Sequence, residues 1–186
     1  MRKIVAVYVL IMLLCGCTLR DDSLTEALEF REKLATSSGC EFDACVTADY
    51  FDSVCSFSLS CSFQSNGDMS FIVLQPETIQ GITGSICENN GYIDFADKVL
   101  AFPLMPDSQL SPASAPWIVL RALRNGYITA CSTESDHYSL YIDDTYDQNP
   151  IRVMMKLTRD FRPEYAEIFC NSRRILAMEI TGFQFL

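Results

Sequence analysis

The hydrophobic pattern of this chain changes at Cys40, and that change constrains the fold more than any other feature. From Cys40 to Tyr50 and from Cys55 to Phe63, apolar and polar residues alternate, and every second residue of the latter run is Ser. Strict alternation is typical of a β-strand that buries one face. Further runs with strand character follow, separated by turn signals, at residues 69–74, 82–87, 92–95, 99–102, 127–132, 138–142, 151–157, 164–170 and 173–185. This spacing predicts about eleven strands in one antiparallel meander.

The first two alternating runs predict a β-hairpin with a definite register. Pairing residues whose numbers sum to 101 sets Phe42 opposite Leu59 and places every apolar side chain on one face. The same register sets Cys40 opposite Cys61, and a directly opposed pair can support a disulfide if it is a non-hydrogen-bonded pair. We therefore expect a Cys40–Cys61 disulfide. The state of the other thiols of the mature chain stays open: Cys45, Cys55, Cys87, Cys131 and Cys170.

Two segments have helical rather than strand character. Residues 23–36 begin with a capping box, Ser23 to Glu26, and carry apolar residues at helical spacing, interrupted by Arg31. Residues 114–125 are apolar on almost every side, with Arg121, Arg124 and Asn125 as exceptions, and Gly126 follows as the expected C-cap. A helix this apolar is covered on most sides. We expect it to lie in the hollow of a curved sheet.

The N-terminus resembles a bacterial lipoprotein signal peptide. Arg2 and Lys3 precede an apolar run, and the sequence Leu14-Cys15-Gly16-Cys17 ends it, with small residues before the cysteine. The run is shorter than the roughly 20 residues that a membrane-spanning helix needs, which disfavours an uncleaved anchor; ordinary secretion is the other alternative. We therefore expect residues 1–16 to be a signal peptide, Cys17 to carry the lipid, 17–22 to be a tether and 23–186 to form one domain. That places the protein at the extracytoplasmic face of a cell membrane.

Charge and composition exclude some classes of function. After removal of residues 1–16, the chain holds 12 basic and 24 acidic residues, so its formal charge is −12. Such a chain repels nucleic acid and the anionic surface of a bilayer, so the expected contact with the membrane is the N-terminal lipid alone. Catalysis is disfavoured, because His137 is the one histidine and no P-loop, nucleophile elbow or zinc-protease motif occurs. An enzyme that uses clustered carboxylates remains an alternative. We expect no cofactor and no metal site.

Four segments of the mature chain carry a resemblance to a known family: Thr47 to Tyr50, Pro76 to Gly84, Ser111 to Tyr127 around Ala115-Pro116-Trp117, and Arg173 to Leu176. With these segments, the mature chain as a whole resembles the LolA/LolB-like lipoproteins, and within them an uncharacterised Gram-positive, clostridial-type group. The resemblance implies an antiparallel half-barrel wrapped around one apolar helix, plus an N-terminal helix, in the mainly β part of the α+β class. It also implies roles such as carrying lipids or lipoproteins, or acting as a partner protein in spore germination.

The candidate ligand site lies between the apolar helix and the sheet. Trp117, Leu120 and Leu123 from the helix are expected to line an apolar cavity with Phe57, Leu59 and Met154 from the sheet. The alternative is an ordinary filled core. Arg121 and Arg124, three residues apart on one side of the helix, are expected either to meet an anionic head group or to pair with acidic residues of the chain.

The leading hypothesis is a membrane-anchored protein that binds a lipid or another apolar ligand without chemistry. The alternative is a scaffold with a filled core that binds a protein partner at the cell envelope or the spore surface.

Overall fold

The computed structural model describes residues 22–50, 53–96, 98–105, 110–134, 136–146 and 149–186. The helices are α2 (Asp22–Thr36) and α3 (Ala115–Asn125), with short 3₁₀ turns η1 (Glu77–Ile79) and η3 (Pro112–Ser114). The strands are β1 (Gly39–Tyr50), β2 (Ser53–Gln64), β3 (Met69–Gln75), β4 (Thr83–Cys87), β5 (Asn90–Phe95), β6 (Lys98–Phe102), β7 (Tyr127–Thr133), β8 (His137–Tyr146), β9 (Asn149–Thr158), β10 (Pro163–Cys170) and β11 (Arg173–Phe185). The predicted content of about eleven strands and two helices is confirmed. Cys17 and the tether lie outside the described residues.

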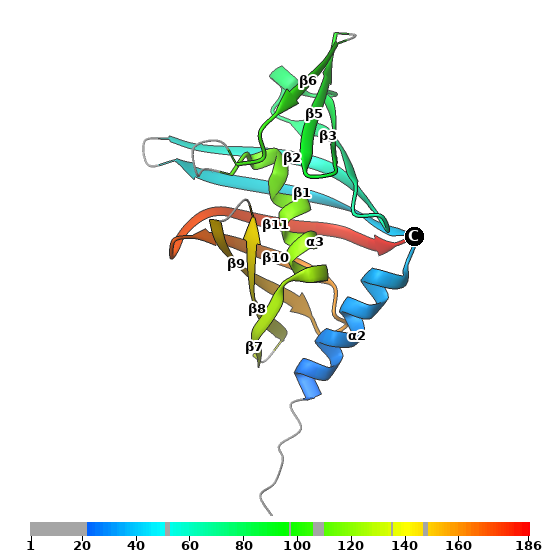
Figure 1. Cartoon of the computed structure of the whole chain (residues 1–186), viewed down its shortest axis with the longest axis vertical. Coiled ribbons are helices and arrows are strands. Elements are labelled where there is room, and N and C mark those ends of the chain that lie inside the picture. Colours follow the sequence, from blue (N-terminus) through cyan, green and yellow to red (C-terminus); the bar gives the residue numbers. More distant parts are fainter. Residues whose placement is uncertain (1–21, 51–52, 97, 106–109, 135, 147–148) are drawn as a thin grey trace, which may run out of the picture.

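All eleven strands form one antiparallel sheet. Their order is β6-β5-β4-β3-β2-β1-β11-β10-β9-β8-β7, so each strand lies beside its sequence neighbour except that β6 and β7 stand at opposite edges, while β1 pairs with β11. Figure 1 shows α3 lying across the middle of the sheet, with α2 toward one end of the long axis and the β5–β6 hairpin at the other. The order therefore differs from the single predicted meander: β1 to β6 and β7 to β11 form two meanders that join through the β1–β11 pair, and β6 and β7 are the edges of the sheet.

The hairpin of β1 and β2 has a register that differs from the predicted one by two residues. Phe42 pairs with Cys61, Ala44 with Leu59 and Cys40 with Phe63, so paired numbers sum to 103. The alternating pattern fixes which face is buried, but a shift of two residues leaves every side chain on the same face. The register is set instead by the reversal, since β1 runs to Tyr50 and β2 begins at Ser53.

The predicted Cys40–Cys61 disulfide is wrong in this register. Cys40 and Cys61 stand diagonally rather than opposite, and both thiols are free. Diagonal positions on paired strands lie farther apart than a disulfide spans. Burial keeps both thiols neutral: it raises the pKa of Cys40 to about 12 and raises the pKa of Cys61 further, with Asp43 and Cys40 adding to the latter shift.

Helix α3 fills the concave face of the sheet as expected. Eight of its eleven residues are buried, and it contacts β8, β10 and β11 together with α2. Gly126 is the C-cap of this helix, as predicted: its N–H donates to the carbonyl of Ala122 at 2.7 Å, and its backbone is extended, with a φ of −70°. Glycine is needed here for space: a Cβ at this position would lie 2.5 Å from Ile142 Cγ2 and 2.6 Å from Ala122 O. Close approach of the chain to β8 therefore explains this glycine.

Helix α2 covers one end of the half-barrel. It begins at Asp22, so Ser23 lies inside its first turn rather than before it. One face of α2 packs inward through Ala27, Phe30 and Leu34, and the helix contacts β7 and α3. Within the described part of the chain, no helix is long and apolar enough to cross a bilayer.

Candidate functional site

The space predicted to be a cavity beneath α3 is filled at the helix. Trp117, Leu120 and Leu123 are at most 4% exposed, and Leu59 on β2 is 1% exposed. A side chain that lines a cavity wide enough for an acyl chain would keep accessible surface, since such a space also admits water-sized molecules. These four residues therefore belong to the close-packed core. The filled-core alternative holds for this part of the predicted site.

The two other sheet residues of the predicted site lie elsewhere. Phe57 is on the core face of β2, opposite Val46, but it is only half-buried. Met154 lies on the outer face of β9, because Val153 and Met155 on either side of it are the buried residues. The prediction for Met154 is therefore wrong by one residue, and a strand's period of two converts that error into the opposite face.

Trp117 has a structural task. Its indole Nε1–H donates a hydrogen bond to the carbonyl of Gly67 in the β2–β3 turn, at 2.9 Å. Its ring meets the Tyr146 ring edge-on, with 6.0 Å between the centroids. A buried indole needs a partner for its N–H, and here that partner is a turn of the sheet. Trp117 thus fastens α3 to β2–β3 on one side and to β8 on the other.

Arg121 pairs with an acidic residue of the chain, as one of the two alternatives predicts. Its Nη1 lies 2.9 Å from Asp144 Oδ2, and its Nη2 donates to the carbonyl of Thr145 at 3.0 Å. The guanidinium also lies near the rings of Trp117 and Tyr146, 5.6 and 5.4 Å from their centroids. With these contacts made, Arg121 has little left to offer an external anion.

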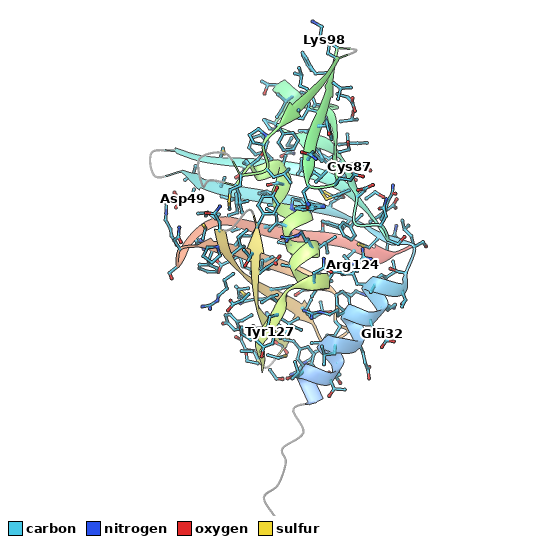
Figure 2. The ribbon with its side chains drawn as sticks, in the orientation of Figure 1. Glu32, Asp49, Cys87, Lys98, Arg124 and Tyr127 are labelled. Carbon is cyan, nitrogen blue, oxygen red and sulfur yellow. The ribbon has the colours of Figure 1, made fainter. Side chains whose placement is uncertain are left out.

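Arg124 has a different environment at the C-terminal end of α3 (Figure 2). In the described part of the chain, its side chain makes no hydrogen bond or ion pair. It lines an open pocket of about 370 Å³ together with Trp117, Arg121 and polar residues of two turns: Asn66, Gly67, Asp68, Glu88 and Asn89. The pocket carries acids as well as arginines. It therefore has no net preference for an anion.

Oxygen ligands for a metal are not gathered in the described ranges. No cluster of three or more His, Cys, Asp or Glu residues able to hold an ion is found there. Asp144 is paired with Arg121, and Asp143 accepts hydrogen bonds from Arg152 at 2.7 and 3.2 Å. The hydrogen bond from Arg152 holds the pKa of Asp143 below its usual value. Both of these aspartates are therefore paired with arginines.

A larger pocket, which sequence reasoning missed, lies between α2, the β9–β10 turn and the end of β11. We call it the aromatic pocket. Its volume is about 980 Å³, within the range of small-molecule sites. Its lining residues are Glu26, Glu29, Phe30, Lys33, Arg159, Asp160, Phe161, Arg162, Gly182, Phe183, Gln184 and Phe185.

Four phenylalanines supply the aromatic part of the pocket's lining, in which polar groups expose more surface than apolar ones. The ring of Phe30 lies 6.0 Å from that of Phe183 and 5.6 Å from that of Phe185, between centroids. The rings of Phe183 and Phe185 meet edge-on at 5.2 Å, and the Lys33 ammonium lies 4.5 Å from the Phe185 centroid. Phe30 and Phe183 are buried and form the floor, while Phe185 and Phe161 keep exposed surface.

The β9–β10 turn supplies the opposite wall of this pocket. Phe161 has a φ of 56°, a left-handed conformation that is costly for a bulky side chain. Stacking on Tyr138, with 4.2 Å between ring centroids, holds it there. Arg159 donates to the carbonyl of Glu134 at 3.0 Å and lies over the Tyr138 ring, so the cationic side of the rim is braced by β8.

The sequence carried only faint signals of this pocket. Phe183 and Phe185 are two residues apart on one strand, and Phe30 and Lys33 are three apart on one helix, so each pair shares a face. Nothing in the sequence shows that these two faces meet across about 150 residues of chain. Arg31 interrupts the apolar pattern of the same helix. Its Nε and Nη2 are buried without a hydrogen-bond partner in the described residues, and burial lowers its pKa.

Comparison with known proteins finds similar structures but no similar sequences. No family model matches the sequence, and no curated protein matches it significantly. A putative outer membrane lipoprotein-sorting protein domain from Vibrio parahaemolyticus has a similar structure, with a TM-score of 0.51 and 9% identity over 86% of this chain and 91% of that one. A LolA superfamily protein from Nitrosomonas europaea matches with a TM-score of 0.48 and 8% identity, over 86% of this chain and 93% of that one. The Mycobacterium tuberculosis lipoprotein LppX matches with a TM-score of 0.39 and 11% identity, over 88% of this chain and 96% of that one.

The fold is therefore LolA-like, as the sequence resemblance implies. At 9% identity the likeness to the Vibrio domain shows the fold alone. The narrower resemblance to a clostridial-type group receives no support from these comparisons.

Proposed function

We propose that this protein is an exported, lipid-anchored envelope protein that binds a single-chain amphiphile in the aromatic pocket, without catalysing a reaction on it. The observation that supports the proposal is the combination of size and lining in that pocket: about 980 Å³, four phenylalanine rings, and a polar, charged rim. An acyl chain would lie on the phenyl rings and its head group would remain at the rim.

The rim determines which head groups fit. Lys33, Arg159 and Arg162 face three acidic residues, Glu26, Glu29 and Asp160, around the same opening. A balanced rim of this kind favours a zwitterionic head group over a simple anion, because each charge of the ligand then finds an opposite partner. Lysophosphatidylcholine is the probe that this chemistry selects.

The experiment uses the chain from Thr18 onward, which includes every described residue, purified without detergent. Binding of lysophosphatidylcholine below its micellar concentration is followed by titration calorimetry and native mass spectrometry. We expect one ligand per chain, and at least tenfold weaker binding for Phe161→Ser and Phe185→Ser, which change two partly exposed side chains; circular dichroism checks that both variants are folded. Phe95→Ser, an exposed phenylalanine on β5 outside the pocket, is the matched control and should bind normally.

Each other outcome contradicts a definite part of the proposal. If no lipid binds, the amphiphile site is wrong. If binding survives both pocket variants but is lost in Leu120→Asp with the fold intact, the ligand lies beneath α3 instead. A separate readout tests the anchor: radiolabelled palmitate should be incorporated into the full chain in bacteria and not into Cys17→Ala.

A second candidate function is a scaffold that binds an envelope protein. The close packing of Leu59, Leu120 and Leu123 favours it, because the interior beneath α3 leaves no room for a cargo at these residues. A chain that binds no amphiphile but is retained on a column of envelope proteins, through a defined partner, would decide for this function.

A further inference from the structure

Strand β6 is an edge of the sheet that the described residues leave uncovered. It has β5 as its one neighbour, and four of its five residues are exposed. Val99 is 65% exposed, Leu100 is 53% exposed, and Phe95, on the adjoining strand, is 56% exposed. Exposed apolar side chains beside unpaired backbone N–H and C=O groups make a template for pairing with another strand.

The usual protections of an edge strand are weak here. The sequence of β6, Lys-Val-Leu-Ala-Phe, has no proline, and its pairing with β5 runs without a register shift from Phe95–Lys98 to Gly91–Phe102. One lysine and the shortness of the strand are what remain. The other edge, β7, differs: it is richer in polar residues and α2 packs against it.

The two faces of β6 differ in what they present. Gly91 pairs with both Ile86, a fully buried core residue, and Phe102, so Lys98, Leu100 and Phe102 lie on the core face of the sheet. The Phe102 ring lies over Gly91, where a Cβ would approach it to 2.5 Å. A strand added beside β6 would therefore extend the core face through Leu100.

We propose that β6 pairs with β6 of a second copy of this chain, antiparallel and centred on Leu100. In this register Leu100 lies opposite its own copy, Val99 opposite Ala101 and Lys98 opposite Phe102, as numbers that sum to 200 require. Each lysine thus meets an aromatic ring and not the other lysine, and all core-face residues keep their face. The strand is self-complementary, which is what a two-fold interface needs.

Charge and position favour a second copy over the alternatives. The chain has a formal charge of −10, so two copies repel over most of their surfaces, but β6 contains one lysine and no acid. Figure 2 shows Lys98 at the far end of the long axis from the start of α2. The start of α2, where the proposed lipid anchor would join the described chain, therefore lies far from this hairpin, which leaves β6 accessible to a neighbour.

The test is sedimentation velocity over a concentration series with the chain from Thr18 onward, under reducing conditions. We expect a concentration-dependent dimer that Leu100→Lys and Leu100→Glu each weaken about tenfold or more, because like charges meet at the two-fold axis. Mixing the two variants should restore dimers, since opposite charges meet at the axis only when one chain of each variant pairs with the other. Val54→Lys changes an apolar side chain on β2 that is 69% exposed; it is the control and should dimerise normally.

Three results would overturn the proposal. The chain could stay monomeric at every concentration, the mixture of Leu100→Lys and Leu100→Glu could fail to dimerise while the unaltered chain does, or Val54→Lys could weaken the dimer as much. Flotation with phosphatidylcholine vesicles tests the alternative that the hairpin contacts a membrane. Vesicle binding by a monomeric chain, lost in Leu100→Lys, would show a membrane contact and exclude the dimer.

Discussion

The two helices lie on the same sheet but play different parts. Eight of the eleven residues of α3 are buried, and its tryptophan and Arg121 bind the sheet on two sides. Helix α2 buries one stripe, leaves Leu24 and Leu28 exposed, and carries Arg31 with buried nitrogens that have no partner among the described residues. A buried donor without a partner costs about 1–3 kcal/mol. The comparison teaches that α3 is part of the core, whereas α2 buries one stripe and borders the aromatic pocket with its exposed side.

The largest expected effect tests the filled core. Replacing Leu123 by Ala should lower the free energy of unfolding by about 2–5 kcal/mol, because the cavity left in a close-packed core cannot collapse fully. Leu28→Ala on α2, at a side chain that is 47% exposed, should change it by about 0.5 kcal/mol at most. Urea denaturation measures both. Similar losses in the two variants would contradict the difference between the helices.

A smaller effect is expected from the buried thiols of the core. Burial raises the pKa of Cys40 from 9.0 to about 12, so the unfolded thiol ionises near pH 9 while the folded one keeps its proton. The unfolded state then binds fewer protons, and stability is full below pH 9 and falls as the pH rises toward 12. Cys61 acts in the same direction.

Urea denaturation under reducing conditions at pH 8, 9 and 10 measures this loss. Between pH 9 and 10 each thiol should contribute roughly 1 kcal/mol, and Cys40→Ala with Cys61→Ala should remove that part of the decline. Cys45→Ala, at an exposed thiol on the outer face, serves as the control and should leave the pH profile as it is. An unchanged profile in the double variant would show that these thiols do not stay neutral in the fold.

The smallest expected effect concerns the ion pair that fastens α3 to β8. The side chains of Arg121 and Asp144 are 23% and 13% exposed, so Asp144→Asn should lower the free energy of unfolding by about 1–2 kcal/mol. Asp143→Asn, which removes the more exposed pair with Arg152, should cost less. Thermal denaturation at low and high salt compares them. Equal losses would mean that burial adds nothing to the pair at α3.

Sequence patterns were enough to locate the elements and to give the buried faces of β1, β2 and α3. Period-two alternation located β1 and β2, and the apolar run after Ser114 located α3, because burial of one face or all faces leaves a direct trace in residue order. The LolA-like fold followed from the same elements. The errors concern register and face. The β1–β2 register differs from the predicted one by two residues, so Cys40 and Cys61 are not opposite each other and form no disulfide. Met154 was assigned to the wrong face of β9 because the prediction was off by one residue.

What the sequence alone determined about this protein is therefore local: which segments are strands and helices, which side of most of them is apolar, and the acidity of the chain. Only the tertiary structure decided whether the space beneath α3 was filled, that Arg121 turns to Asp144, and that Phe30, Phe161, Phe183 and Phe185 gather beneath α2. The physical reason is that packing density and pocket shape depend on how distant segments approach one another. Residue order constrains that approach through faces and register, but does not encode it in any single stretch of the chain.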